Sequence, residues 1–392
     1  MLQTVYLDHN ATTPIHPDLR AKVAEWLEVW GNPSSIHWAG RGPKALLREA
    51  RTSVARLLGV ESLELIFTSG GSEANNLAIQ GVCSLVPSAP GERNQIIIST
   101  VEHPSVRKTV EALRARGYRM DLIPVNREGQ LDLTALANLL SERTALVSVM
   151  LANNETGHIF PVAEVARMAR AVGALAHCDA VQALGKIPLN VRELGADLVS
   201  FSGHKFYALK GCGVLFARKG INLTSLIYGG GQERGRRAGT ENLPAIASLG
   251  FMTEKAAEIA VQTERLRKLR DLMEEMILRE IDGVTVTGRS GLRLPNTSSL
   301  VLAGVDGETL LMNLDVRGFA VSTGAACSSG SPEPSPTLLA MGLTRDEAQS
   351  SLRLSLGWWT TADDVVSFVT ALKAVVIRLR SFKHGEKFAY GV

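Results

Sequence analysis

The chain has 392 residues, of which 45% are hydrophobic and 21% charged, a composition typical of globular proteins. This length exceeds what one compact core usually fills, so two domains that share an interface are expected. The 42 basic and 39 acidic residues nearly cancel to a net charge of +3. This balance gives no electrostatic reason to expect nucleic acid or an acidic surface as a partner.

Targeting and membrane signals are absent from the sequence pattern. The N-terminus has no basic segment followed by an apolar run, and no stretch is apolar enough to cross a bilayer. The cysteines are scattered without a CxxC pair, so neither a disulfide scaffold nor a metal site is expected. We therefore expect a cytoplasmic protein that does not bind a membrane. The four cysteines are Cys83, Cys178, Cys212 and Cys327.

Helical and strand-like segments alternate between residues 43 and 217, which predicts an α/β fold with a mostly parallel, seven-stranded sheet covered on both faces. Helical patterns cover Pro43–Leu58, Ser72–Leu85, Pro104–Arg116, Thr134–Ser141 and Pro161–Val172. Strand-like runs cover Ile66–Thr68, Ile96–Ser99, Met120–Pro124, Ala145–Met150, Leu175–Cys178, Leu198–Ser202 and Val214–Ala217.

The pattern changes after Thr240. Residues 241–280 predict one long helix, which leads into a smaller α+β domain. We expect a large domain over residues 15–255 and a small domain over residues 1–14 and 256–392. The small domain should hold strands at Val284–Thr287, Ser298–Leu302, Ala320–Ser322 and Leu352–Leu356, and helices at Gly307–Val316 and Thr360–Arg380.

Residues that directly follow the strands are the first candidates for a binding site, because ligands of such sheets bind beyond the carboxyl ends of the strands. After the first strand, Gly71 and Ser72 open a helix, where free N–H groups attract an anion such as a phosphate. An ordinary turn with Ser72 as the N-cap fits equally simply, and the motif alone favours that interpretation.

Three further strands also end in polar residues. His103 stands at a helix entrance, where a cap or a surface position is the ordinary interpretation. Asn154 lies in a segment dense in turn-forming residues. Asp179 is either the N-cap of the next helix or a buried carboxylate that needs a cationic or hydrogen-bonding partner.

The segment Ser202-Gly203-His204-Lys205 indicates a functional site more specifically than the preceding motifs do. A lysine directly after an apolar strand is poorly placed for a solvated surface charge. Desolvation there lowers its pKa, and the amine can then form a Schiff base. The alternative is a lysine whose head reaches water, but this short turn gives it little apolar surface to cover.

These parts complement one another. An aldehyde cofactor with a phosphate and a pyridine ring needs a lysine, an anion cradle, a carboxylate for the ring nitrogen and a flat group to stack on the ring. Lys205, the turn around Ser72 together with Ser202, Asp179 and His103 supply these needs in that order. The sequence therefore predicts a site for pyridoxal phosphate.

Cys327 lies in a loop of small residues between Gly324 and Gly330. A structural cysteine usually sits within an apolar run. We interpret Cys83 on a helix face, Cys178 on a strand and Cys212 between two glycines as structural. We interpret Cys327 as an exposed nucleophile. A loop thiol without function is the alternative.

Taken together, these residues resemble the cysteine desulfurases, enzymes of the class V aminotransferase group with the pyridoxal-phosphate fold type I. The resemblance runs nearly end to end and is most specific around Lys205 and Cys327, where the loop resembles the longer-loop group that serves iron–sulfur assembly. It also rests on the segments at residues 6–14, 31–37, 67–70, 153–155, 179–182, 237–240 and 351–357.

The resemblance implies roles for individual residues. Lys205 carries the cofactor and moves protons, and Cys327 attacks the sulfur of L-cysteine, becomes a persulfide and passes the sulfur to an acceptor such as an iron–sulfur scaffold. Asn154 and Arg353 hold the substrate carboxylate. The other cofactor contacts that the resemblance implies are Gly71, Ser72, His103, Asp179, Gln182, Ser202 and His204, with Thr240 from the partner of a homodimer. Among these, the resemblance assigns Gln182 a hydrogen bond to the phenolic oxygen of the cofactor.

Two departures from the family pattern and two rival functions remain. Ser72 replaces a common threonine, and extra prolines at residues 332, 334 and 336 stiffen the end of the Cys327 loop. An aminotransferase or a selenocysteine-preferring or other C–S lyase is the first rival function. A catalytically inactive scaffold is the second, and intact Lys205, Asp179, His103 and Cys327 argue against it.

Overall fold

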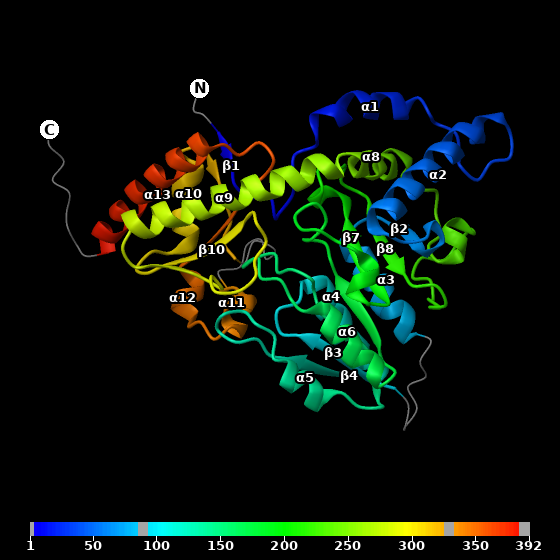
Figure 1. Ribbon diagram of the computed structural model, residues 1–392, viewed down its shortest axis with the longest axis horizontal. Helices are drawn as coiled ribbons and strands as arrows, with labels where there is room; N and C mark the ends of the chain where they lie inside the picture. Colours follow the sequence, from blue (N-terminus) through cyan, green and yellow to red (C-terminus); the bar gives the residue numbers. More distant parts are fainter. Residues whose placement is uncertain (1–3, 85–92, 325–332, 384–392) are drawn as a thin grey trace.

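The computed structural model describes residues 4–84, 93–324 and 333–383, and a seven-stranded sheet forms the centre of its larger part (Figure 1). The strand order is β2-β8-β7-β6-β5-β3-β4. Only β8 runs antiparallel to its neighbours, β2 and β7. The strands are β2 (Leu65–Thr68), β3 (Gln95–Ser99), β4 (Arg119–Ile123), β5 (Thr144–Ser148), β6 (Leu175–Asp179), β7 (Leu198–Ser202) and β8 (Gly213–Ala217).

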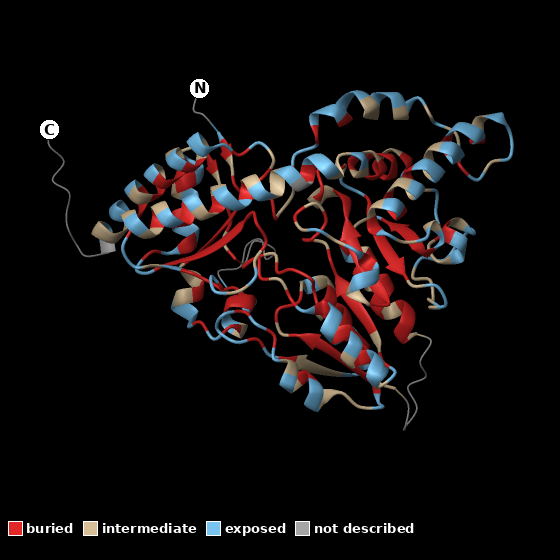
Figure 2. Ribbon diagram, in the orientation of Figure 1, coloured by how far each residue is buried: buried red, intermediate tan, exposed pale blue. Residues whose placement is uncertain are grey.

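Both faces of this sheet are buried except along the edge strand β4, and apolar side chains point alternately to each side of its strands (Figure 2). Ile96 and Ile98 pack with α3 and α4 on one face, whereas Ile97 packs with α2, α6 and α8 on the other. The helices are α1 (Pro17–Leu27), α2 (Trp38–Leu58), α3 (Gly71–Cys83), α4 (Pro104–Leu113), α5 (Leu133–Leu139), α6 (Val162–Ala171), α7 (Val191–Leu194) and α8 (Leu243–Glu254).

The C-terminal part has its own sheets and its own hydrophobic core. An antiparallel sheet has the order β12-β10-β9, and β1 of the N-terminal arm pairs in parallel with β11. Its elements are β1 (Val5–Tyr6), α9 (Ala256–Glu280), β9 (Val284–Val286), β10 (Thr297–Leu302), α10 (Gly307–Asp315), β11 (Phe319–Ala320), α11 (Pro336–Ala340), α12 (Arg345–Gln349), β12 (Ser351–Ser355) and α13 (Ala362–Lys383).

Each predicted strand is present with ends within two residues of the prediction.

The prediction of one helix over residues 241–280 is wrong, because the chain leaves helical geometry at Lys255, between α8 and α9. The Lys255 side chain pairs with Asp18, 2.8 Å away, and with Glu258 at 3.2 Å. Helix α8 packs against α2, whereas α9 continues towards the second sheet (Figure 1). The domain boundaries at residues 14 and 255 stay a prediction.

In the described ranges, no helix is long and apolar enough to cross a membrane.

Candidate active site

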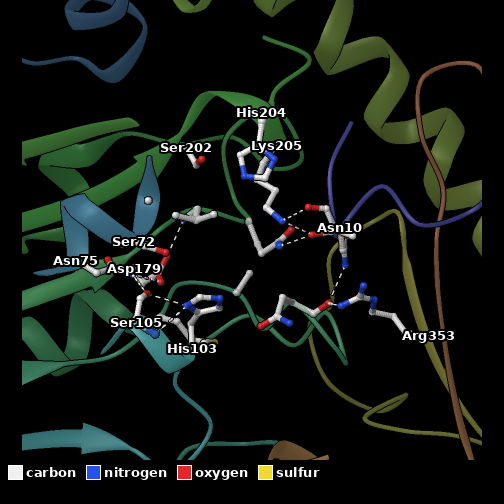
Figure 3. Close-up of a pocket in the computed structure, with 17 residues that line it drawn as sticks. Asn10, Ser72, Asn75, His103, Ser105, Asp179, Ser202, His204, Lys205 and Arg353 are labelled. Carbon is white, nitrogen blue, oxygen red and sulfur yellow. Dashed lines mark hydrogen bonds between the residues drawn. The ribbon is translucent and has the colours of Figure 1, made fainter. Parts of the chain in front are cut away.

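A cavity of about 350 Å³ opens at the carboxyl ends of the central strands (Figure 3). The N-terminal arm closes one side of it with Asn10 and Ala11, and β12 contributes Arg353. Ten of the twelve site residues predicted from the sequence line this one cavity: Gly71, Ser72, His103, Asn154, Asp179, Gln182, Ser202, His204, Lys205 and Arg353.

Lys205 lies in a single 3₁₀ turn, residues 203–205, that directly follows β7. Its Nζ donates hydrogen bonds to the backbone carbonyl oxygens of Asn10, at 2.5 Å, and Ala11, at 2.6 Å. The carbonyls of the N-terminal arm thus hold the amine of Lys205 at the edge of the cavity (Figure 3).

Asp179 and His103 belong to one hydrogen-bond network, which passes through Asn75 (Figure 3). Asn75 Nδ2 donates to Asp179 Oδ2, at 2.7 Å, and to Ser105 Oγ, at 2.9 Å. Ser105 Oγ lies 2.7 Å from His103 Nδ1. A second bond, from the backbone N–H of Val181, reaches Asp179 Oδ1 at 3.0 Å. The carboxylate is therefore held from two sides.

The protonation of His103 follows from this network. Nδ1 accepts the backbone N–H of Ser105, at 3.1 Å, as the N-cap of α4. Burial lowers the pKa of His103, with the charge of Asp179 opposing this effect and that of Lys205 adding to it. The ring is therefore neutral at neutral pH, and its single proton sits on Nε2, since Nδ1 is an acceptor.

The end of the cavity that is lined by Gly71, Ser202 and His204 is suited to an anion. Helix α3 begins at Gly71, where a Cβ atom would stand 2.6 Å from Val181 Cγ2, so glycine permits this close approach. The N–H groups of the first turn then face the cavity together with Ser202, whose buried Oγ has no hydrogen-bond partner within the described part of the chain. His204 completes this end, and burial lowers its pKa to about 4.

Arg353 approaches from the second sheet. Its Nη2 binds Asp8 Oδ1 at 2.7 Å, and its Nη1 donates to the carbonyl oxygen of Asn154 at 3.3 Å. Its Nε is buried and has no hydrogen-bond partner among the residues that the structure describes. An almost fully buried guanidinium with unused donor capacity is suited to a carboxylate ligand.

The remaining two predicted site residues are Thr240 and Cys327. Thr240 lines a separate surface cleft beside Thr68 and Arg237. The predicted contact of Thr240 is with the site of a partner subunit, and this contact stays a prediction. Cys327 lies outside the described residues.

The three described cysteines are buried and free. Burial raises the thiol pKa of Cys83 and Cys212 to about 12, and raises that of Cys178 well above its usual value. A thiol in such surroundings is rarely a thiolate and is a poor nucleophile.

Sequence reasoning missed several polar residues of the site, among them Asn10, Asn75 and Ser105. Asn75 is 1% exposed within the otherwise apolar inner face of α3, and a buried amide of this kind is the signal that points to a partner. Asn10 comes from the N-terminal arm, so its contact with Lys205 spans 195 positions of sequence. Periodicity within a segment does not predict a contact of that range.

The geometry fits pyridoxal phosphate. The cavity offers an amine, a carboxylate held by Asn75, a neutral imidazole and an anion-binding end with an unpartnered Ser202 hydroxyl. This chemistry lies at the strand ends of a mostly parallel seven-stranded sheet, which is where such folds bind ligands. Fold and site together define a pyridoxal-phosphate enzyme of fold type I.

Comparison with known proteins narrows this class. Residues 5–368 match the aminotransferase class-V family. A cysteine desulfurase of Cereibacter sphaeroides is 44% identical over 385 residues, with 97% of each chain covered. The cysteine desulfurase IscS of Dictyoglomus turgidum is 43% identical over 383 residues, which cover 97% of this chain and 96% of that protein.

Solved structures agree with these relatives. A NifS-like protein superimposes with a TM-score of 0.89 at 34% identity, covering 96% of this chain and 100% of the other. The chain belongs to the class-V aminotransferase family and, within it, to the cysteine desulfurases. The predicted family, fold type and cofactor are thereby confirmed.

Proposed function

We propose that this protein is a pyridoxal-phosphate-dependent cysteine desulfurase that converts L-cysteine to L-alanine and transfers the sulfur to Cys327 and on to acceptor proteins. The observation that carries this proposal is the convergence of Lys205, Asp179 and His103 in one cavity with an anion-binding end. The identity to desulfurases over nearly the whole chain supports the same reaction.

The proposed cofactor contacts follow from the positions of the side chains. Lys205 would hold the cofactor covalently, Asp179 would face its ring nitrogen and His103 its ring. Ser72, Ser202 and His204 would hold the phosphate together with the first turn of α3. When bound there, pyridoxal phosphate supplies an electron sink that stabilises negative charge on the substrate carbon.

The residues of the chain provide the remaining functions. Lys205 Nζ accepts and returns protons at the edge of the cavity, and His103 offers the proton on Nε2. Arg353 and the neighbouring Asn154 orient the substrate carboxylate. The arm and the second sheet border the cavity and limit the access of water.

Sulfur transfer requires a thiol nucleophile, and Cys327 is the residue we assign. Its sulfur bonds to the substrate sulfur while the C–S bond of the substrate breaks, and the carbon that loses sulfur takes up a proton. The products are a persulfide on Cys327 and alanine. The buried, poorly ionised Cys83, Cys178 and Cys212 are unsuited to this step.

We further propose a cytoplasmic homodimer in which Thr240 of one subunit completes the phosphate site of the other, and an acceptor protein of the iron–sulfur scaffold type. The cleft that contains Thr240 and Arg237 shares no lining residue with the Lys205 cavity of the same chain. That position supports a role towards a second subunit.

The decisive experiment compares the purified wild-type protein with Cys327→Ala. The wild type should be yellow and should release equal amounts of alanine and, with a reductant present, sulfide from L-cysteine. Cys327→Ala should stay yellow, change its visible spectrum with L-cysteine and form no protein persulfide. Cys83→Ala is the matched control and should keep its activity. A Cys327→Ala variant that desulfurates cysteine at the wild-type rate would contradict the proposal.

A further inference from the structure

Lys186 is a buried lysine beside the cavity that the proposed reaction does not use. It lies in the turn after β6 and is 8% exposed. Burial, together with the charges of Lys205 and Arg353, holds the pKa of Lys186 well below its usual value. Burying an amine costs free energy unless the amine is hydrogen-bonded. The hydrogen-bond partners of Lys186 therefore indicate its role.

Both partners of Lys186 are neutral amide oxygens. Its Nζ donates to Gln182 Oε1 at 2.5 Å and to Asn10 Oδ1 at 2.7 Å. These two bonds form in either charge state, because a neutral amine still has two N–H groups. A primary amine or ammonium group in this position therefore makes both amides turn their oxygens towards it.

The orientation of Gln182 has a consequence for the cavity, which Gln182 lines. With Oε1 bound to Lys186, the NH₂ group is left on the cavity side. One of its hydrogens goes to the backbone oxygen of Asn10, at 3.0 Å. The other is available to a ligand. A flipped amide would instead present its oxygen to the cavity and to the Asn10 oxygen, and oxygen atoms with only lone pairs repel.

We propose that Lys186 is a positioning residue, which fixes the amide of Gln182 so that this residue donates a hydrogen bond to the phenolic oxygen of pyridoxal phosphate. The inference rests on the proposed function, since it needs the cofactor in this cavity. Lys186 acts through Gln182 and does not itself touch the cofactor.

The test measures cofactor binding to the apo enzyme by fluorescence titration and records the visible absorption band. Lys186→Met removes the terminal donor and keeps most of the length of the unbranched side chain. We expect it to raise the dissociation constant for pyridoxal phosphate about tenfold or more and to shift the absorption band. Lys219→Met, the same change at an exposed lysine, is the matched control and should leave both unchanged.

A double-mutant cycle distinguishes positioning from general structural support. In a Gln182→Ala background, Lys186→Met should change the dissociation constant less than twofold. The inference is overturned if Lys186→Met alone binds like the wild type, or if its effect is equally large in both backgrounds. A wild-type chain that stays colourless with pyridoxal phosphate contradicts the proposed function itself and this inference with it.

Gln182→Glu covers the case in which Lys186→Met does not fold. The carboxylate can still pair with Lys186 but has no N–H to present to the cavity. It should weaken cofactor binding and shift the band as Lys186→Met would. Unchanged binding and an unchanged band would overturn the inference.

Discussion

At the scale of single residues, the site depends on side chains that hold other side chains. Asn75 uses both N–H groups of its amide, one on Asp179 and one on Ser105, which in turn contacts His103. It thereby sets the carboxylate and the imidazole relative to each other. Such supporting hydrogen bonds fix the geometry of a site more closely than the reacting groups could alone.

Asn75→Ala should weaken pyridoxal phosphate binding about ten- to hundred-fold, because a hydrogen bond to a charged group contributes about 1.5–3 kcal/mol. The measurement is a titration of the apo enzyme with the cofactor. Asn76→Ala is the matched control on the next position of α3, since Asn76 does not line the cavity. Equal affinities for both variants would show that Asp179 is held sufficiently by Val181 N–H.

Arg353→Lys should raise KM for L-cysteine about ten- to hundred-fold. A guanidinium grips a carboxylate with two parallel hydrogen bonds, which a lysine cannot reproduce, and charge-assisted contacts contribute about 1.5–3 kcal/mol. Steady-state kinetics of alanine formation provide the value. An unchanged KM would place the substrate carboxylate elsewhere.

At the scale of elements, buried carboxyl groups join loops to the strands and helices next to them. Glu155, beside Asn154, accepts hydrogen bonds from Ser335 and from Thr337, the latter at 2.9 Å. Both donors lie at the start of α11, where Ser335 is the N-cap. Glu102 joins the loop after β3 to the end of β5 in the same way.

Glu102→Gln should change how stability depends on pH. Burial is the main cause that raises the pKa of Glu102 to about 8. The folded protein therefore keeps this proton between about pH 4.5 and 8, whereas the unfolded chain has lost it. Wild-type stability from this group falls as pH rises through that window, by about 1.4 kcal/mol per pH unit.

Glutamine has no such proton, and its oxygen can still accept from Met150 N and Ser99 Oγ. The free energy of unfolding of Glu102→Gln, minus that of the wild type, should therefore increase from pH 5 to pH 8 and level off above pH 8. Denaturant unfolding of both proteins at these pH values tests this. Parallel pH profiles would show that Glu102 ionises in the folded state as it does in the unfolded chain.

At the scale of the whole molecule, the N-terminal arm joins the two parts of the structure. Residues 5 and 6 pair with β11, while Asn10 and Ala11 hold Lys205 beside the central sheet. The cavity thus lies where the arm, the central sheet and the second sheet meet. Its integrity depends on the relative position of both parts.

Subunit mixing tests the proposed homodimer. Lys205→Ala and Thr240→Ala chains should each be inactive as homodimers, because each lacks one component of every site. In a mixed dimer, one of the two sites carries both substitutions and the other carries neither. Mixing the two variants should therefore restore up to about one quarter of the wild-type activity per total chain. If light scattering shows a monomer and that monomer has its full cofactor content, the shared site is contradicted.

The order of helices and strands and much of the cavity follow from the sequence by itself. Lys205 and Asp179 each come at the end of an apolar strand, and parallel strands bring their carboxyl ends to one edge of a sheet, so their proximity could be predicted. Only the tertiary structure shows that Asn10 contacts Lys205 and that Lys186 is buried against Asn10 and Gln182. Local patterns do not determine which distant segment packs on a turn, and it is this packing that buries Lys186 and gives its amine Asn10 as a partner.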